Sequence, residues 1–290
     1  MSPNTGQKSN LGQLAGLACL LEVSAPKPGN VHRGADFEDM SFIDFAVSAM
    51  ALVDPLNRVQ ETRVGECVLD CVKETRLVTR QNTNLGLILL LVPLAKAFSL
   101  RQVCNRESIN EVLAAADSAD TNLVYQAIRL ARPSGLGNVE QADVANQTDL
   151  SLVDSMKLAE HRDLIAGQYA NNFDNVRNEC LVELRNCLDR GLSLTESIIH
   201  THVVTMSIHP DSLIQRKCGV EIANQSAALA ARVVNAGDPT DASYLTSLGE
   251  LDFWLRADGH RRNPGTTADL IGATIFCALL DATIKFPITV

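Results

Sequence analysis

The chain has 290 residues, of which 46% are hydrophobic and 4% aromatic, and it carries a formal net charge of -9. This length allows either one large domain or two, and the composition is that of a globular protein with an aliphatic core. The acidic balance argues against nucleic acid as a partner, because proteins that bind it usually carry a basic surface. Residues 1–10 are polar and lack a secretory signal. The most apolar run, Leu85–Leu94, has half the length of a transmembrane helix, so we expect a soluble, cytoplasmic protein without a membrane partner.

The cysteines are expected to be reduced and buried, because the chain has eight of them and no secretory signal. Cys67 and Cys71 would share one helix face, but no second pair and no nearby histidine completes a tetrahedral metal site with them.

Apolar residues recur at helical spacing through most of the chain, and we find no alternating strand of useful length. In chain order, helices are expected at 11–23, from 41 onward, at 56–79, after Asn84, and at 108–119, 121–131, 155–168, 175–190, 193–207, 219–236, 244–255 and 266–285. The helices that begin after Asn84 and at Thr266 are apolar nearly all round, which places them at the centre of the core. We therefore predict an all-α fold in which residues 1–290 form one large multi-helix domain. A long polar loop at about 132–153 would be either a lid or disordered.

Four polar segments interrupt the helical pattern, at 24–40, 80–84, 209–217 and 261–269. Each one adjoins a predicted helix N-terminus, where unpaired N–H groups and partial positive charge favour phosphate. Simple capping is the alternative, since Asn82, Asp211 and Thr266 are good N-caps and Thr266 with Asp269 would form a capping box. Because charged residues recur in these segments, we favour a shared polar cleft at the helix N-termini.

The first of these segments, 24–40, is stiffened by two prolines. It combines cations with carboxylates, which suits a site where phosphate lies beside a divalent metal. Its ionisable residues are Lys27, His32, Arg33, Asp36, Glu38 and Asp39. Magnesium usually bridges one or two carboxylates to phosphate oxygens. A remaining carboxylate could act as a general base or could stabilise a cationic sugar centre.

These segments resemble the triphosphoribosyl-dephospho-CoA synthase family. The resemblance rests on Pro-Lys-Pro-Gly at Pro26–Gly29, on Gly34, Ala35, Asp39 and Met40, on Asn82, Thr83 and Gly86, on Arg216 and Gly219, and on Pro264, Gly265, Ala268, Asp269 and Leu270. The motifs occur in order over most of the chain.

The resemblance implies an all-helical enzyme that transfers the triphosphoribosyl group of ATP to the 2′-hydroxyl of dephospho-CoA, releases adenine and depends on Mg²⁺. It implies nucleotide binding by Lys27, Asn82, Thr83, Arg216, Lys217, Gly265 and Thr266. Asp39, Asp211 and Asp269 would be metal ligands, and Asp36 or Glu38 would act on the sugar or on the incoming hydroxyl. The oligomeric state is open, and a homodimer is one option.

The chain departs from the family pattern at three places. His32 stands where an aspartate is usual, Asn84 and Leu85 stand where His-Lys is usual, and the spacing from Gly34 to Asp39 is longer. A sister enzyme that transfers a ribosyl or phosphoribosyl group to another acceptor, for example in a pterin-type one-carbon cofactor pathway, is therefore an alternative. A helical protein that binds a nucleotide without turnover is another.

Overall fold

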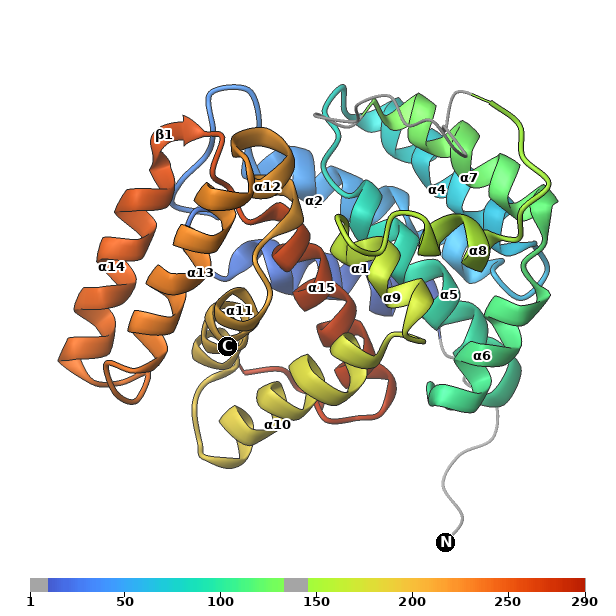
Figure 1. The fold of residues 1–290 in the computed structure, drawn as a ribbon. Helices are drawn as coiled ribbons and strands as arrows, with labels where there is room; N and C mark the ends of the chain where they lie inside the picture. Colours follow the sequence, from blue (N-terminus) through green and yellow to red (C-terminus); the bar gives the residue numbers. More distant parts are fainter. Residues whose placement is uncertain (1–9, 133–145, 290) are drawn as a thin grey trace, which may run out of the picture.

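The computed structural model describes residues 10–132 and 146–289 and confirms the all-α fold (Figure 1). In the described part the only strand is the four-residue β1 (Ala257–His260). The helices are α1 (Leu11–Ser24), α2 (Phe42–Ala51), α3 (Val53–Asn57), α4 (Val64–Val78), α5 (Leu85–Arg101), α6 (Arg106–Ala115), α7 (Ser118–Ala131), α8 (Leu152–Lys157), α9 (Leu164–Ala170), the π-helical turn η1 (Asn175–Cys180), α10 (Leu181–Asp189), α11 (Leu194–Ile208), α12 (Ser212–Cys218), α13 (Val220–Val234), α14 (Ala242–Arg256) and α15 (Gly265–Leu280).

The two long apolar helices α5 and α15 pack against each other at the centre of the molecule (Figure 1). Both are buried on nearly every face, because their sequences offer almost no polar side chain to solvent. The prediction of two central apolar helices is therefore confirmed. Among the described residues no single helix is both long and apolar enough to cross a bilayer, and α5 and α6 meet that length and composition only as a pair bent by 110°.

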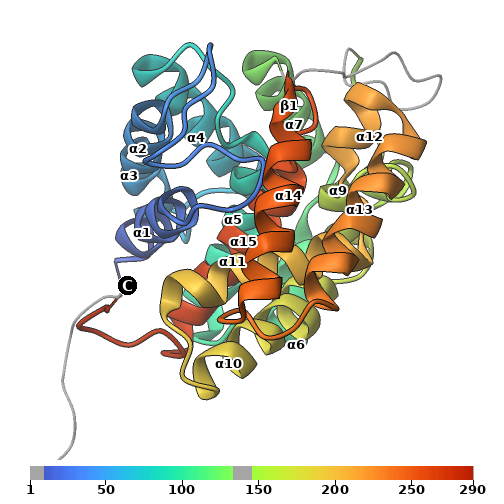
Figure 2. The same cartoon turned by 90° about the vertical axis from the view of Figure 1, so that its left-hand side faces the viewer.

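A second, smaller cluster of buried residues joins α11, α12, α13 and α14. Figure 2 shows α13 and α14 lying side by side, and α11 connects this layer to the main core by packing against α15. All eight cysteines are free, and most of them are buried.

Two predicted helices are each broken in the structure. The helix expected over 155–168 is α8 followed by α9, because the side chain of Asp163 accepts hydrogen bonds from Ile165 N (2.8 Å) and Ala166 N (3.3 Å) and so starts a new helix. The helix expected over 56–79 begins only at Val64. The prediction of continuous helices was wrong at both places, since periodicity does not reveal a cap inside an apolar pattern.

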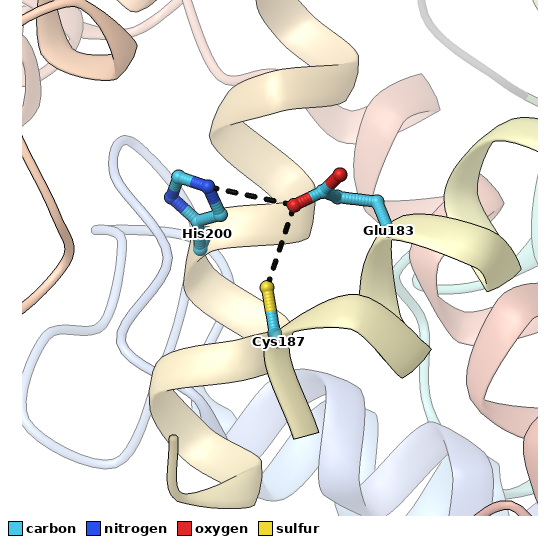
Figure 3. A group of neighbouring side chains, drawn as sticks. All are labelled: Glu183, Cys187 and His200. Carbon is cyan, nitrogen blue, oxygen red and sulfur yellow. Dashed lines mark hydrogen bonds and ion pairs between the residues drawn. The ribbon is translucent and has the colours of Figure 1, made fainter. Parts of the chain in front are cut away.

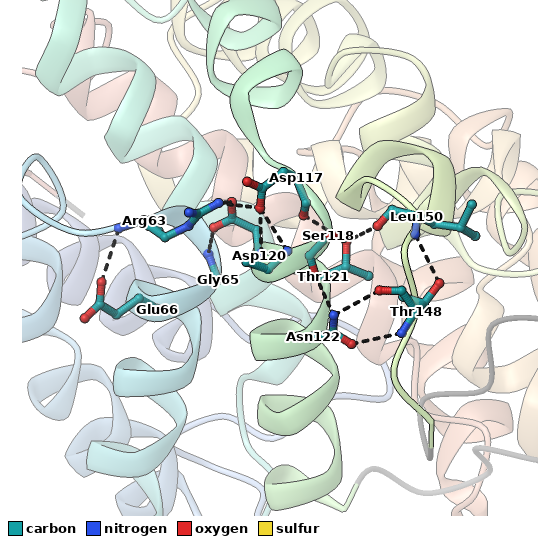
Figure 4. Close-up of polar contacts among 11 residues, drawn as sticks. Arg63, Gly65, Glu66, Asp117, Ser118, Asp120, Thr121, Asn122, Thr148 and Leu150 are labelled. Carbon is teal, nitrogen blue, oxygen red and sulfur yellow. Dashed lines mark hydrogen bonds and ion pairs between the residues drawn. The ribbon is translucent and has the colours of Figure 1, made fainter.

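Asp120 holds the start of α4 against α7 (Figure 4). Its Oδ1 accepts a hydrogen bond from Gly65 N at 2.8 Å, and its Oδ2 lies 2.8 Å from Arg63 Nη2. One buried carboxylate therefore binds a guanidinium and a helix N-terminus together.

The described end of the predicted polar loop is bound to α7. Asn122 exchanges two hydrogen bonds of 3.0 Å with the backbone of Thr148, and Thr121 Oγ1 donates to Leu150 O at 2.8 Å (Figure 4). The prediction of a lid or disordered loop over 132–153 falls mainly on residues 133–145, which lie outside the described residues.

Candidate active site

A cavity of about 640 Å³ lies where the first turns of α5 and α15 meet the segment that follows α1. Its volume is typical of small-molecule sites, which span about 300–1,000 Å³. Side chains from all four polar segments of the sequence line it, and the predicted site residues among them are Asp39, Asn82, Thr83, Arg216, Lys217, Gly265, Thr266 and Asp269. The predicted residues Lys27, Asp36, Glu38 and Asp211 are not part of the lining.

Asp269 is the carboxylate most directly placed for a ligand. The structure starts α15 at Gly265 with no side-chain cap, so Asp269 does not form the capping box that its spacing from Thr266 suggested. Asp269 is half-buried, and among the described residues it has no hydrogen-bond or ion-pair partner. Burial first, and then the nearby carboxylate of Glu22, raise the pKa of Asp269 well above its usual range. A cation beside it would remove this penalty.

Gly86 makes room for that carboxylate at the N-terminus of α5. A Cβ at this position would lie 2.1 Å from Asp269 Oδ2, so any other residue here would force the carboxylate of Asp269 to move. The first turns of both central helices therefore reach the cavity, α5 through Gly86 and α15 through Gly265 and Thr266. Helix N-termini provide partial positive charge and backbone N–H groups for phosphate oxygens.

Lys27 occupies a different position from the one expected for a nucleotide ligand. It is fully buried, its Nζ lies 2.8 Å from Glu22 Oε1, and it also donates to the backbone carbonyls of Glu22 and Ala25. Glu22, which the sequence reasoning missed, does line the cavity. Lys27 thus neutralises and positions a cavity carboxylate, because a buried charge needs a partner.

Asp211, expected to bind metal, is fully engaged as the N-cap of α12. Its Oδ1 accepts hydrogen bonds from Leu213 N (2.8 Å) and Ile214 N (3.0 Å). Its Oδ2 accepts hydrogen bonds from Thr267 N (2.7 Å) and Thr267 Oγ1 (2.8 Å). Burial raises the pKa of Asp211, and these hydrogen bonds oppose the shift. Asp211 therefore joins α12 to the first turn of α15, as the capping alternative predicted.

The three carboxylates of the first polar segment lie apart from one another. Asp36 accepts a hydrogen bond from Phe42 N at 2.7 Å, at the start of α2, and Glu38 is exposed. Only Asp39 reaches the cavity, where its Oδ1 lies 3.5 Å from His260 Nε2. The ring of Phe37 stacks on His260 with centroids 4.9 Å apart, which holds this segment against β1.

Six cationic side chains line the cavity, namely Arg76, Arg80, Arg132, Arg162, Arg216 and Lys217. Arg216 Nη1 lies 2.7 Å from Asp163 Oδ2, the side chain that also starts α9. Lys217 Nζ donates to Asn263 Oδ1 at 3.0 Å, and burial lowers the pKa of Lys217. Arg80, Arg132 and Arg162 have no carboxylate partner among the described residues, so their guanidinium groups can bind phosphate.

Asparagines provide the remaining polar wall. Asn82 Oδ1 accepts a hydrogen bond from Leu85 N (3.3 Å), and Thr83 Oγ1 donates to Ser48 Oγ (2.7 Å). Within the described structure, Asn30 Oδ1 and Asn84 Nδ2 are buried at the wall without a hydrogen-bond partner. Such atoms usually mark a place where a ligand or water completes the site. In the sequence, the only sign that Asn30 and Asn84 belong to the site is that each lies in one of the four polar segments.

Comparisons with known proteins show the family. A model of the ATP:dephospho-CoA triphosphoribosyl transferase family matches residues 8–287. The chain belongs to this family. A crystal structure of an Archaeoglobus fulgidus protein, provisionally assigned as a triphosphoribosyl-dephospho-CoA synthase, is 28% identical in sequence. It superposes with a TM-score of 0.63 over 82% of this chain and 98% of that one. No curated protein matches the chain.

The departure of this family member at Asn84 and Leu85 falls on the cavity wall. This position lacks the cation that the family pattern suggests, but Arg76 and Arg80 line the same cavity. Arg76 Nη1 donates a hydrogen bond to the backbone carbonyl of Arg80. The positive charge of the site is therefore carried largely by arginines, which bind phosphate through two parallel hydrogen bonds.

Proposed function

We propose that this transferase moves the triphosphoribosyl group of ATP to the 2′-hydroxyl of dephospho-CoA and releases adenine. Membership of the family, together with one cavity that holds phosphate-binding groups and carboxylates, supports this function. The cavity is also lined by apolar side chains, which suit a purine ring and the acceptor. Among them are Phe37, Phe45, Tyr125, Ile128 and Ile165.

The residues present fit a magnesium ion at Asp269. Its carboxylate is half-buried, faces the cavity and has no partner among the described residues, and Glu22 supplies a second carboxylate nearby. Mg²⁺ prefers one or two carboxylates and completes its octahedron with water and substrate phosphates. Asp269 would hold the ion, which when bound would neutralise triphosphate charge.

The cavity side chains would act on two parts of ATP, the triphosphate and the C1′ atom of the ribose. Arg80, Arg132 and Arg162, with the first turns of α5 and α15, would hold the triphosphate and orient the ribose. The C1′–N9 bond breaks and its electron pair leaves with adenine, so positive charge develops at C1′ and is stabilised by nearby carboxylates. The acceptor oxygen forms the new bond to C1′, and we assign its proton to Asp39, the carboxylate that reaches the cavity from the first polar segment.

Adenine release tests this function and distinguishes it from its alternatives. Incubation with ATP, Mg²⁺ and dephospho-CoA should release one adenine for each triphosphoribosylated acceptor, as measured by chromatography and mass spectrometry. Release that requires a different acceptor would support a sister transferase instead. ATP binding without release under any acceptor would contradict the proposal and leave a nucleotide-binding protein.

A further inference from the structure

Three potential metal ligands meet between α10 and α11, and none of them lines the candidate active site. Glu183 and Cys187 are one turn apart on α10, and His200 faces them from α11 (Figure 3). Their ligand atoms all lie within 4.8 Å of one another. The three side chains point toward a common point.

The distances between these atoms fit a tetrahedral zinc site. Cys187 Sγ lies 3.5 Å from Glu183 Oε1, and His200 Nε2 lies 3.6 Å from the same oxygen. Zinc bonds of about 2.3 Å to sulfur and about 2.1 Å to nitrogen and oxygen imply tetrahedral edges of about 3.6 Å for S–O and about 3.4 Å for N–O. The imidazole and carboxylate are too far apart for a good hydrogen bond, yet they are at the spacing of two ligands of one ion.

A second observation concerns the orientation of the imidazole. His200 Nδ1 lies 2.9 Å from the hydroxyl of Tyr244, a buried residue of α14. This contact fixes the ring so that Nε2 faces Glu183. Histidines that bind metal through one nitrogen almost always hydrogen-bond through the other, and this partner sets the tautomer.

The surroundings also suit a divalent ion with one thiolate and one carboxylate ligand, because the three charges sum to zero. Cys187 is fully buried and His200 nearly so, whereas the side chain of Glu183 is 26% exposed and leaves a path from solvent. Zinc binds cysteine as the thiolate, so metal binding would release the thiol proton of Cys187 to solvent.

We propose that Glu183, Cys187 and His200 bind Zn²⁺, with water in the fourth position on the side of Glu183. The thiolate and the imidazole select a borderline-soft cation over Mg²⁺. The ion joins α10 to α11 at a place outside the lining of the candidate active site.

Zinc titration of the chelator-stripped full chain tests this proposal, in excess Mg²⁺ so that oxygen sites are occupied. A chromophoric competitor should report one zinc per chain. Cys187→Ser and His200→Gln should each weaken binding by more than tenfold, and Tyr244→Phe by about tenfold through loss of the orienting contact. The matched control is Cys180→Ser, a buried thiol whose neighbour is the hydroxyl of Thr205 at 3.3 Å, and it should leave affinity unchanged.

Cobalt substitution gives a readout that does not depend on the stability of the variants. The native chain with Co²⁺ should show a thiolate-to-cobalt charge-transfer band, and Cys180→Ser should keep it. Absence of this band in the native chain, absence of tight zinc binding, or retention of both in Cys187→Ser would overturn the proposal.

Discussion

Replacing Asp269 by asparagine should stabilise the ligand-free protein while abolishing magnesium-dependent ATP binding. The substitution keeps the shape and removes an ionisable group whose pKa is raised by burial and by Glu22. An acid with a raised folded pKa costs no stability below its unfolded pKa near 3.9 and costs most above its folded pKa. An ionisable group that is partly withdrawn from water and lacks a partner costs up to about 1–3 kcal/mol. For a chain of this size the gain in Tm at pH 8 should be about 2–6 °C, at roughly 2 °C per kcal/mol.

Thermal melts with and without ligand measure both effects in one experiment. Mg²⁺ and ATP at a hundredfold excess over Kd should stabilise the native chain by about 2.7 kcal/mol, or roughly 5 °C, and should leave Asp269→Asn unchanged. The gain of the variant over the native chain should shrink as pH falls toward 4. A variant that melts lower than the native chain without ligand, or that keeps the full ligand shift, would refute this reasoning.

Asp211→Asn is the matched control for this experiment, because it replaces a buried carboxylate that is hydrogen-bonded. Its amide would place N–H groups against the N–H or O–H of Thr267, which now donate to Oδ2. The substitution should therefore lower Tm, with a cost of about 1–3 kcal/mol. Opposite signs at the two aspartates would show that the unpartnered state of Asp269 is the cause.

Three further substitutions test the site. Gly86→Ala places a Cβ 2.1 Å from Asp269 Oδ2, so calorimetry should show at least tenfold weaker binding of magnesium-ATP. Gly249→Ala, where nothing lies within 4 Å, should leave binding unchanged, and equal effects would contradict the argument. Lys27→Met leaves a buried carboxylate unpaired and should cost about 3–5 kcal/mol in urea unfolding; a cost below 1 kcal/mol would refute a structural role for this lysine. Arg162→Gln should weaken ATP binding by about 1.5–3 kcal/mol without lowering Tm, and unchanged affinity would remove this arginine from the site.

Local sequence signals predicted the fold and the segments that line the cavity. Helical periodicity and the polar breaks placed the central helices and the cavity segments, because both depend on neighbours in the chain. The helix expected from 41 onward is α2, which begins with a capping box of Ser41 and Asp44. Local patterns also misled at 155–168, where Asp163 interrupts the predicted helix.

The roles of individual charges depended on contacts that are distant in sequence. Asp211 and Asp269 both stand near a helix start, yet one caps its helix and the other lies against Gly86, far away in the chain. Lys27 looked like a phosphate ligand because it lies in a stiff loop, but the loop folds it back onto Glu22. Only three-dimensional packing reveals which carboxylate faces the cavity.

Anomalous diffraction from crystals soaked with ATP and Mn²⁺ tests the central claim most directly. Manganese replaces magnesium at oxygen sites and can be located by its own scattering. We predict an anomalous peak about 2.1 Å from a carboxylate oxygen of Asp269, with the triphosphate between the first turns of α5 and α15. A manganese ion bound elsewhere on the chain, or ATP bound outside this cavity, would contradict the account.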